Sequence, residues 1–288
     1  MTVVTPTILD GNVVLDRVKA DLRTRIAALA ERGVTVGLGT ILVGDDAGSA
    51  MYIQMKRENC AELGIDSIHT RLPADAKQGD VEALVDDYNA NPAVHAYLMQ
   101  YPFPKGLDFE TALLRVDPDK DVDGLHPVNL GKLVQGVRGP RSCTPAGIQA
   151  LLAHYEVPIA GRHVVIVGRG LTVGKALANL LSLKEPNANA AVTMVHTGVP
   201  DLAPYTRRAD ILVVAAGSPG LITADMVKPG AAVVQTGATF RDGKIAPDVD
   251  PGVREVAGWF APATGSVGPM TRAMLLSNVV SAAERRAG

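Results

Sequence analysis

The sequence predicts an α/β protein of two domains built on parallel sheets, and three observations support this prediction. Apolar, β-rich runs alternate with helical patterns through the first hundred residues. A charged, turn-rich segment interrupts the alternation at residues 117–129, and a new series of strands and helices follows. A glycine-rich turn then stands between an apolar run and a helical pattern. Such alternation is typical of parallel strands joined by crossover helices.

Composition excludes several classes of protein. The chain has 288 residues, 47% of them hydrophobic and 20% charged, which is enough for roughly two domains with buried cores. The net charge is −2 and the basic residues are dispersed, so we expect no nucleic-acid partner. No apolar run reaches the roughly 18 residues of a membrane span, and the N-terminus lacks the pattern of a signal peptide. We therefore expect a cytoplasmic protein with no membrane partner.

The alternating elements of the first half are short and well separated. Strands are predicted at 35–44, 67–72 and 93–100, and helices at 47–63 and 81–90. Gln100 ends the last of these strands, where parallel sheets place their ligands. Cys60 and Cys143 lie far apart and form no metal-ligand spacing, so we expect two free thiols and no metal site.

The helix predicted at 47–63 carries a lysine on its apolar side. An arc of roughly 100° holds five of its residues: Tyr52, Ile53, Lys56, Cys60 and Leu63. Desolvation there would favour a neutral amine able to transfer protons, although a lysine can also extend its stem along such a stripe and expose its charge. Tyr52 could equally be an ordinary amphipathic core residue, and Ser49 a helix cap.

The segment 117–129 marks the domain boundary. Its Lys120 and Asp121 are predicted to lie in a solvated, charged turn. A helix is predicted to begin at "CTPAGIQALLAHY", with Thr144 as its N-cap and Pro145 at its first position.

Glycines 168, 170 and 174 form a G-x-G-x-x-x-G pattern, one residue longer than the common dinucleotide-binding fingerprint. The pattern alone is also typical of a structural turn. Further strands predicted at "AVTMVH", "DILVVAAG" and "AAVVQTG" favour nucleotide binding at the following helix N-terminus. Arg169 lies in the turn, and no carboxylate follows the second strand before Asp201, which favours NADP over NAD.

Seven segments in order carry a resemblance to a known family: "SAMYIQMK", "MQYPFP", "DKDVDGLHPVNLGKL", "CTPAGI", "VGRGLTVGKAL", "KPGAAVV" and "SVGPMTRAML". Over nearly its whole length the chain resembles the bifunctional methylenetetrahydrofolate dehydrogenase/cyclohydrolase family. The resemblance implies a folate-binding domain at 1–140 and 268–288, whose C-terminal helix packs back on it. It further implies a Rossmann-type NADP domain at 141–267 and a homodimer built through that domain.

The resemblance also implies roles for individual residues. Lys56 and Tyr52 match catalytic residues, Gln100 the glutamine that bonds the lysine, and Asp123 the pterin-binding aspartate. Substrate binding is implied for Ser49, Tyr52, Gln100, Asp123, Gly265 and Pro269. Cofactor binding is expected at Thr144, Gly168, Arg169, Gly170, Val173, Gly174, His196, Thr197, Ala216 and Gly237.

The implied activity is NADP-dependent oxidation of 5,10-methylenetetrahydrofolate, then hydrolysis of the methenyl product to 10-formyltetrahydrofolate. The chain departs from the family pattern at Tyr101, Phe103, Gln235, Pro247, Thr264 and Ser266. Several of these positions are expected to line the ligand cleft. Two alternatives therefore stay open: a paralogue with one activity or an altered pterin-like substrate, and a catalytically silent NADP- or folate-binding module.

Overall fold

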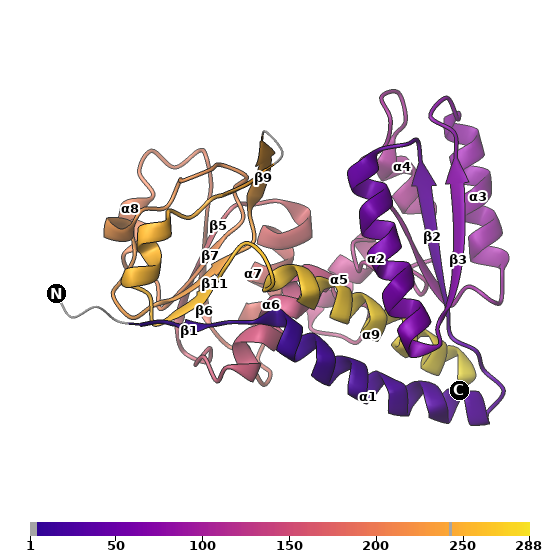
Figure 1. The fold of residues 1–288 in the computed structure, drawn as a ribbon, viewed down its shortest axis with the longest axis horizontal. Coiled ribbons are helices and arrows are strands. Elements are labelled where there is room, and N and C mark those ends of the chain that lie inside the picture. The colour runs from indigo at the N-terminus through magenta and orange to yellow at the C-terminus, as the bar shows by residue number, and fades with distance from the viewer. Residues whose placement is uncertain (1–4, 242–243) are drawn as a thin grey trace. The chain divides into compact units, whose positions relative to one another are not determined.

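The computed structural model describes residues 5–241 and 244–288, and the chain divides into two compact units (Figure 1). Met1–Asp16 and Thr144–Thr271 form the first, here called the six-stranded unit after its sheet. Arg17–Cys143 and Arg272–Gly288 form the second, the three-stranded unit. Within the described residues, no helix is long and apolar enough to cross a membrane.

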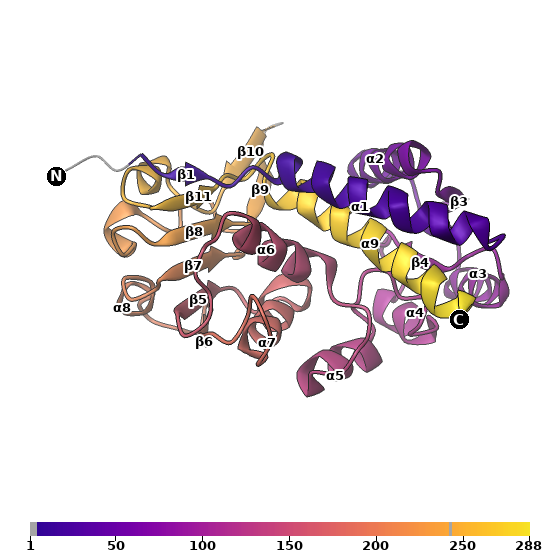
Figure 2. The same cartoon turned by 90° about the horizontal axis from the view of Figure 1, so that it is seen from below.

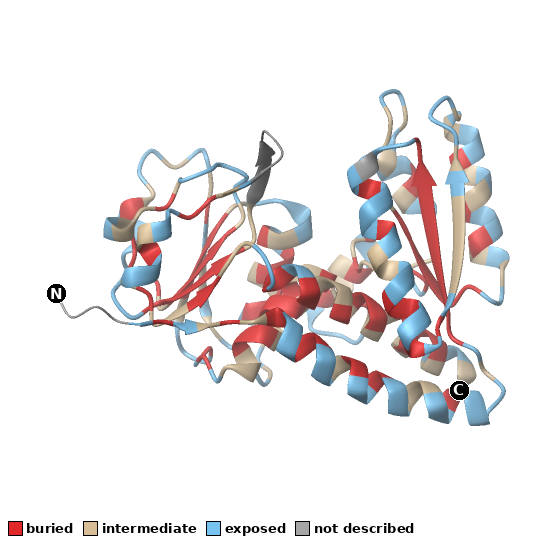
Figure 3. Ribbon diagram, viewed as in Figure 1, coloured by how far each residue is buried: buried red, intermediate tan, exposed pale blue. Residues whose placement is uncertain are grey.

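The three-stranded unit has a parallel sheet in the order β3-β2-β4. Its strands are β2 (Gly37–Val43), β3 (Asp66–Leu72) and β4 (Ala96–Met99). Its helices are α2 (Ala47–Leu63), α3 (Gln78–Ala90), α4 (Phe109–Arg115) and α5 (Pro127–Gln135). The central strand β2 is buried along its whole length (Figure 3). The strands and helices predicted between residues 35 and 100 are all present.

Alternate residues of the sheet pack into two cores, as the period of a strand requires. Ile41 and Met99 belong to a core with residues of α3 and α4. Leu38 and Leu98 belong to the core on the other side, formed with α1 (Gly11–Glu31), α2 and α9 (Val267–Ala287).

Helices α1 and α9 lie side by side (Figures 1 and 2). Leu22 and Leu29 of α1 share a core with Leu276 and Val280 of α9. The Arg25 guanidinium also donates two hydrogen bonds to the Glu284 carboxylate, from Nε at 2.8 Å and from Nη2 at 2.7 Å. The prediction that the C-terminal helix packs on the first domain is therefore confirmed.

The six-stranded unit has an all-parallel sheet in the order β1-β11-β8-β7-β5-β6. Its strands are β1 (Thr7–Ile8), β5 (His163–Val167), β6 (Ala191–Val195), β7 (Ile211–Val214), β8 (Ala232–Gln235) and β11 (Trp259–Ala261). After β5 the chain forms β6 on one side and then β7 on the other. This reversal is the kind of switch point where Rossmann-type sheets bind ligands.

Helical segments and one hairpin complete this unit. They are α6 (Cys143–His154), the π-helical η1 (Leu171–Lys175), α7 (Ala176–Ser182), α8 (Ala203–Thr206), and the 3-10 segments η2 (Ala224–Met226) and η3 (Pro251–Glu255). Strands β9 (Ala238–Arg241) and β10 (Lys244–Pro247) pair as an antiparallel hairpin. Helix α6 begins at Cys143, so the predicted start, with Thr144 as the cap and Pro145 at the first position, is two residues too late.

The predicted domain limits need one correction. Residues up to Asp16 belong to the six-stranded unit, whereas 1–140 were predicted to form the first domain. The physical reason is that Thr7 and Ile8 pair with Trp259 and Phe260 at the edge of the large sheet. The other observed boundaries, at 143/144 and 271/272, lie within four residues of those predicted.

The segment that joins α4 to α5 contradicts the prediction of a solvated turn. Lys120 is only 2% exposed, and its Nζ donates to the carbonyls of Tyr88 and Asn91, each at 2.8 Å. Asp121 is also buried, at 3% exposure. Burial, the largest cause, lowers the Lys120 pKa to about 8. These charges are internal because they bond backbone groups that would otherwise be left unpaired.

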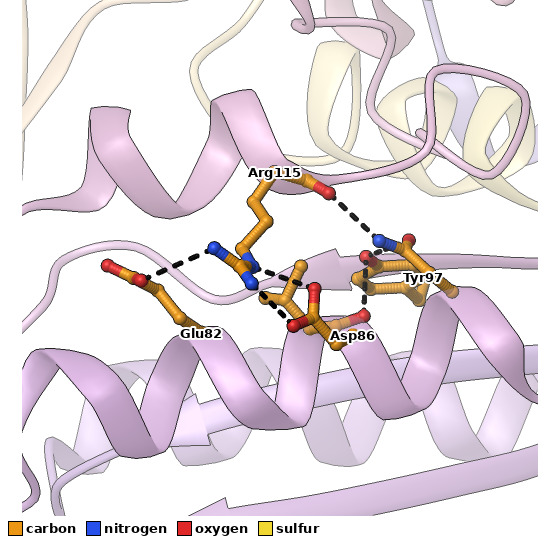
Figure 4. Close-up of polar contacts among 6 residues, drawn as sticks. Glu82, Asp86, Tyr97 and Arg115 are labelled. Atoms are coloured by element: carbon orange, nitrogen blue, oxygen red, sulfur yellow. Dashed lines mark hydrogen bonds and ion pairs between the residues drawn. The ribbon is translucent and has the colours of Figure 1, made fainter.

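A polar network fastens α4 to α3 beside this segment (Figure 4). Arg115 donates two bonds to Asp86, at 2.7 and 2.6 Å, and lies 3.6 Å from Glu82. The Asn89 amide donates to the Arg115 carbonyl, and its Oδ1 accepts from the buried Tyr97 hydroxyl at 2.7 Å. The exposed ion pairs contribute little by themselves, whereas the internal Tyr97–Asn89 bond holds α3 to β4.

We expect Lys120→Met to destabilise the protein, because the Tyr88 and Asn91 carbonyls would lose their donor. The expected cost is about 1–3 kcal/mol for each carbonyl left unpaired. Chemical denaturation would measure the free energy of unfolding, with Lys105→Met, a change at an exposed lysine of the same unit, as control.

The pH dependence of that difference has a definite sign. A folded pKa of about 8 lies below the ordinary lysine value of 10.5, so the unfolded chain holds more protons between these limits. The stability of the parent relative to Lys120→Met should therefore rise as the pH increases from 8 to 10.5. A difference that falls over this range would contradict burial of the amine.

Ser266, which directly precedes α9, has no exposed surface, and its hydroxyl has no hydrogen-bond partner. Ser266→Ala removes this unpaired group and leaves the Cβ in place. We expect the free energy of unfolding to rise by about 1 kcal/mol. The exposed neighbour Thr264 provides the control, since Thr264→Ala should change stability by no more than about 0.5 kcal/mol. Destabilisation by Ser266→Ala would show that the hydroxyl is satisfied in solution.

Candidate active site and nucleotide cavity

Helix α2 presents Lys56 at the carboxyl end of the three-stranded sheet. Asp46 caps the helix by accepting a bond from the Ser49 backbone N–H at 2.7 Å, so Ser49 is buried in the first turn and is not the cap. Three residues of the predicted stripe are buried: Ile53, Cys60 and Leu63. The placement of Tyr52 on that buried stripe is wrong, because its side chain is 53% exposed. An exposed ring one turn before Lys56 is free to contact a ligand.

Lys56 is held by a neutral amide. Its Nζ donates to Gln100 Oε1 at 3.0 Å, and the Gln100 Nε2 donates to the Tyr101 carbonyl at 2.9 Å. The second bond orients the amide so that its oxygen faces the amine. The hydrogen bond implied by the resemblance is therefore present. Burial is the largest influence on Lys56 and lowers its pKa, which makes the amine a better proton carrier near neutral pH.

Asp123 is the charged group that does most to raise the Lys56 pKa, against the lowering caused by burial. Burial raises the Asp123 pKa, the Lys56 charge opposes this shift, and Asp121 reinforces it. Lys56 and Asp123 thus influence each other electrostatically. The site combines an amine, a neutral amide and a carboxyl group, which suits recognition of a heterocycle bearing N–H groups and proton transfer to it.

Asp121 fixes the loop that carries Asp123. Its two carboxylate oxygens accept from the backbone N–H of Gly124 at 3.0 Å, that of His126 at 2.8 Å and the Asn129 amide at 2.9 Å. Asp121 was predicted to lie in a solvated turn, and its buried role in the loop is a correction to that prediction. The buried turn that it forms determines where Asp123 points.

The two cysteines are free, as predicted, and both are buried. Burial raises the Cys60 pKa to about 12 and the Cys143 pKa well above its ordinary value. Neither thiol is therefore a nucleophile near neutral pH. Within residues 5–241 and 244–288, no cluster of three or more His, Cys, Asp or Glu could hold a metal ion.

The aromatic departures from the family pattern form a small cluster. Phe109 packs edge-to-face with Tyr101 and with Phe103, at ring-centroid distances of 5.4 and 5.1 Å. Tyr101 is 66% exposed and follows Gln100 directly. The cluster therefore supports one exposed ring next to the Lys56–Gln100 pair.

The glycine turn of the six-stranded unit has two kinds of glycine. Gly168 has φ +124°, and a Cβ there would lie 2.3 Å from the Ala215 carbonyl oxygen; a Cβ at Gly174 would lie 2.2 Å from the Gly168 oxygen. These two are needed by the fold itself. A Cβ at Gly170 would meet nothing within 4 Å, so the protein alone does not require glycine there. The open space above Gly170 fits close approach of a ligand.

The extra residue in the glycine pattern has a structural cause. The Lys175 N–H bonds the Gly170 carbonyl at 3.1 Å, five residues back, and η1 is a single π-helical stretch before α7. A π turn holds one residue more than an α turn, which accounts for three residues between Gly170 and Gly174.

A cavity of about 660 Å³ lies at the carboxyl ends of β5, β6 and β7. Six predicted cofactor residues line it: Gly168, Arg169, Gly170, His196, Thr197 and Ala216. Four others do not: Thr144, Val173, Gly174 and Gly237. Ser218 and Asp201 also line the cavity but were not predicted to bind the cofactor. The position of Ser218 just after a parallel strand could have identified it.

The remaining predicted substrate residues, Gly265 and Pro269, belong to the six-stranded unit. The Gly265 carbonyl accepts from the N–H of Gly11 and the Asn12 amide. Two departures expected near a ligand, Gln235 and Ser266, are buried instead, at 3% and 0% exposure. Both side chains lie in the interior because the fold encloses the end of β8 and the start of α9.

Two segments of the chain match the two domains of one known family. Residues 9–123 match the family described as "Tetrahydrofolate dehydrogenase/cyclohydrolase, catalytic domain", and residues 142–287 match its "NAD(P)-binding domain". The chain is 54% identical to the "Bifunctional protein FolD" of Syntrophotalea carbinolica over 97% of each chain.

Solved structures agree with this relationship. The bifunctional enzyme FolD of Campylobacter jejuni is 38% identical, with a TM-score of 0.93 over 97% of this chain and 99% of that one. The Trypanosoma brucei dehydrogenase-cyclohydrolase, solved with NADP cofactor and an inhibitor, is 35% identical, with a TM-score of 0.90 over 98% of both chains. This chain belongs to the tetrahydrofolate dehydrogenase/cyclohydrolase family.

Proposed function

We propose that the chain catalyses both reactions of its family: NADP-dependent oxidation of 5,10-methylenetetrahydrofolate and hydrolysis of the methenyl product to 10-formyltetrahydrofolate. The observation that carries the proposal is the bond from Lys56 to Gln100, in which a partly desolvated amine faces a neutral partner. A carboxylate partner would hold the amine protonated, whereas an amide orients it and leaves it able to exchange protons.

In hydrolysis, water adds to the methenyl carbon and the resulting ring opens. Lys56 carries protons between the attacking water and the departing ring nitrogen. Gln100 keeps the amine oriented, and Asp123 accepts hydrogen bonds from the amino and ring N–H groups of the pterin. The exposed Tyr52 ring packs against the folate ring system.

In oxidation, this chain's task is to bind and align. The glycine turn and the 660 Å³ cavity fit a dinucleotide, because Gly170 leaves open space where a pyrophosphate needs close backbone approach. NADP held there would supply the hydride acceptor for the methylene carbon. Arg169 lines the same cavity as His196 and Thr197 and is the group we assign to the adenosine 2′-phosphate.

We extend the proposal to a cytoplasmic homodimer. Two free, buried thiols fit a reducing compartment, and the family resemblance supports the dimer. Light scattering of the purified protein would measure the oligomeric state.

A coupled absorbance assay that follows NADPH and the methenyl intermediate together tests the activities. Both signals, with the methenyl species rising and then decaying faster than in buffer, are expected. NADPH formation without accelerated decay would identify a paralogue with dehydrogenase activity only. A protein that binds NADP but produces neither signal would be a silent binding module.

Lys56→Met should abolish hydrolysis and leave substantial hydride transfer, because methionine fills the volume of the lysine stem but carries no proton. We expect at least about a hundredfold loss of cyclohydrolase rate. Lys56→Arg is the matched variant: it keeps a positive charge that does not titrate near neutral pH. Equal loss in both variants supports proton transfer, whereas hydrolysis at the parent rate in either would contradict it.

Arg169→Ala should weaken NADP binding by roughly 1.5–3 kcal/mol and change NAD binding little, because only NADP carries the 2′-phosphate. Binding titrations with both cofactors would measure this. Arg162→Ala is the control, since Arg162 lines a different cavity, beside Trp259 and Lys228. Equal losses for NADP and NAD would show that Arg169 does not recognise the phosphate.

A further inference from the structure

Asp248 is a buried acid that the proposed mechanism does not use. It follows β10, has no exposed surface, and does not line the 660 Å³ cavity. Its Oδ2 accepts the backbone N–H groups of Ala216 and Gly217, each at 2.8 Å. Its Oδ1 has no hydrogen-bond partner. Burying a carboxyl group with so few hydrogen bonds costs free energy, which indicates that its two bonds to backbone amides have a function.

The two amides belong to the loop that follows β7, and this loop forms part of the cavity wall. Ala215, Ala216 and Ser218 line the cavity together with Gly168 and Arg169. The loop also touches the glycine turn, because a Cβ on Gly168 would lie 2.3 Å from the Ala215 oxygen. A change in the loop therefore reaches the turn directly.

Backbone shape explains why one oxygen can bind both amides. Gly217 has φ +65°, the left-handed conformation in which successive N–H groups converge on an anion. The carboxylate occupies this small nest from inside the protein. The carboxylate also lies against Gly237, where a side chain would not fit, since a Cβ there would lie 1.8 Å from Oδ2. Gly237 thus contributes by admitting Asp248 and not by lining the cavity.

We propose that Asp248 is a positioning residue for cofactor binding, which acts by holding the Ala215–Ser218 loop in its ligand-ready conformation. The inference rests on nucleotide binding by this unit, part of the proposed function. Asp248 does not line the cavity, yet it accepts hydrogen bonds from the two loop amides. The backbone of the loop is therefore held in one conformation before any ligand binds.

Asp248→Ala should raise the Kd for NADPH, measured by fluorescence titration, at least about tenfold, because both amides lose their acceptor. The KM for NADP should rise in parallel while kcat changes by a smaller factor. Asp248→Asn keeps an oxygen that can accept both amides, so its Kd should stay within about threefold of the parent. Asp250→Ala is the matched control: Asp250 accepts the Gly252 N–H at 2.8 Å in the same segment and should leave Kd unchanged.

Amide hydrogen exchange keeps the test decisive if Asp248→Ala does not fold. The Ala216 and Gly217 amides should exchange slowly in the cofactor-free parent and in Asp248→Asn. Fast exchange in the parent, or an Asp248→Ala protein with a lowered Tm and an unchanged Kd, would overturn the proposal. A parent protein that fails to bind NADPH would instead contradict the proposed function.

Discussion

The attachment of the loop at residues 120–122 to the edge of β4 determines the geometry of the candidate active site in the three-stranded unit. The Tyr97 N–H donates to the Lys120 carbonyl at 2.8 Å, and the Val122 N–H donates back to the Tyr97 carbonyl at 3.3 Å. The loop thus continues the parallel sheet by one bridge, Tyr97 to Asp121. Because β4 leads to Gln100 and the loop to Asp123, this bridge sets the position of one functional group relative to the other. The buried Lys120 amine also holds the loop, through its bonds to the carbonyls of Tyr88 and Asn91.

The predictable parts of the structure are those encoded by neighbouring residues. Helix α2 and the strands on either side of it follow from local periodicity and from caps such as Asp46 and Gly64. Lys120 and Asp121 could not be placed in this way. Their partners, the Tyr88 carbonyl and the Asn129 amide, are 32 and 8 residues away, and a run of charges resembles a solvated turn until those partners are known.

The same distinction applies to the nucleotide turn. Position between a strand and a helix was enough to predict that Gly168 and Gly170 meet a ligand cavity. The sequence does not show which glycine the fold itself requires. Gly168 is required because it lies against Ala215, which follows a different strand, whereas Gly170 faces open space. The family resemblance supplied residue roles that periodicity does not encode, Asp123 among them.

The path of the chain has a consequence for its synthesis. The edge strand at Thr7–Ile8 pairs with residues 259–260, and the core of the three-stranded unit includes Leu275 to Ala283. Both units therefore depend on segments that are translated long after the residues with which they pair. During translation, the apolar faces of α1 and of strand β2 must wait for α9 before their shared core is complete. Until α9 has been translated, these apolar faces stay exposed to solvent, so the core of the three-stranded unit closes only after residues 275–283 have been made.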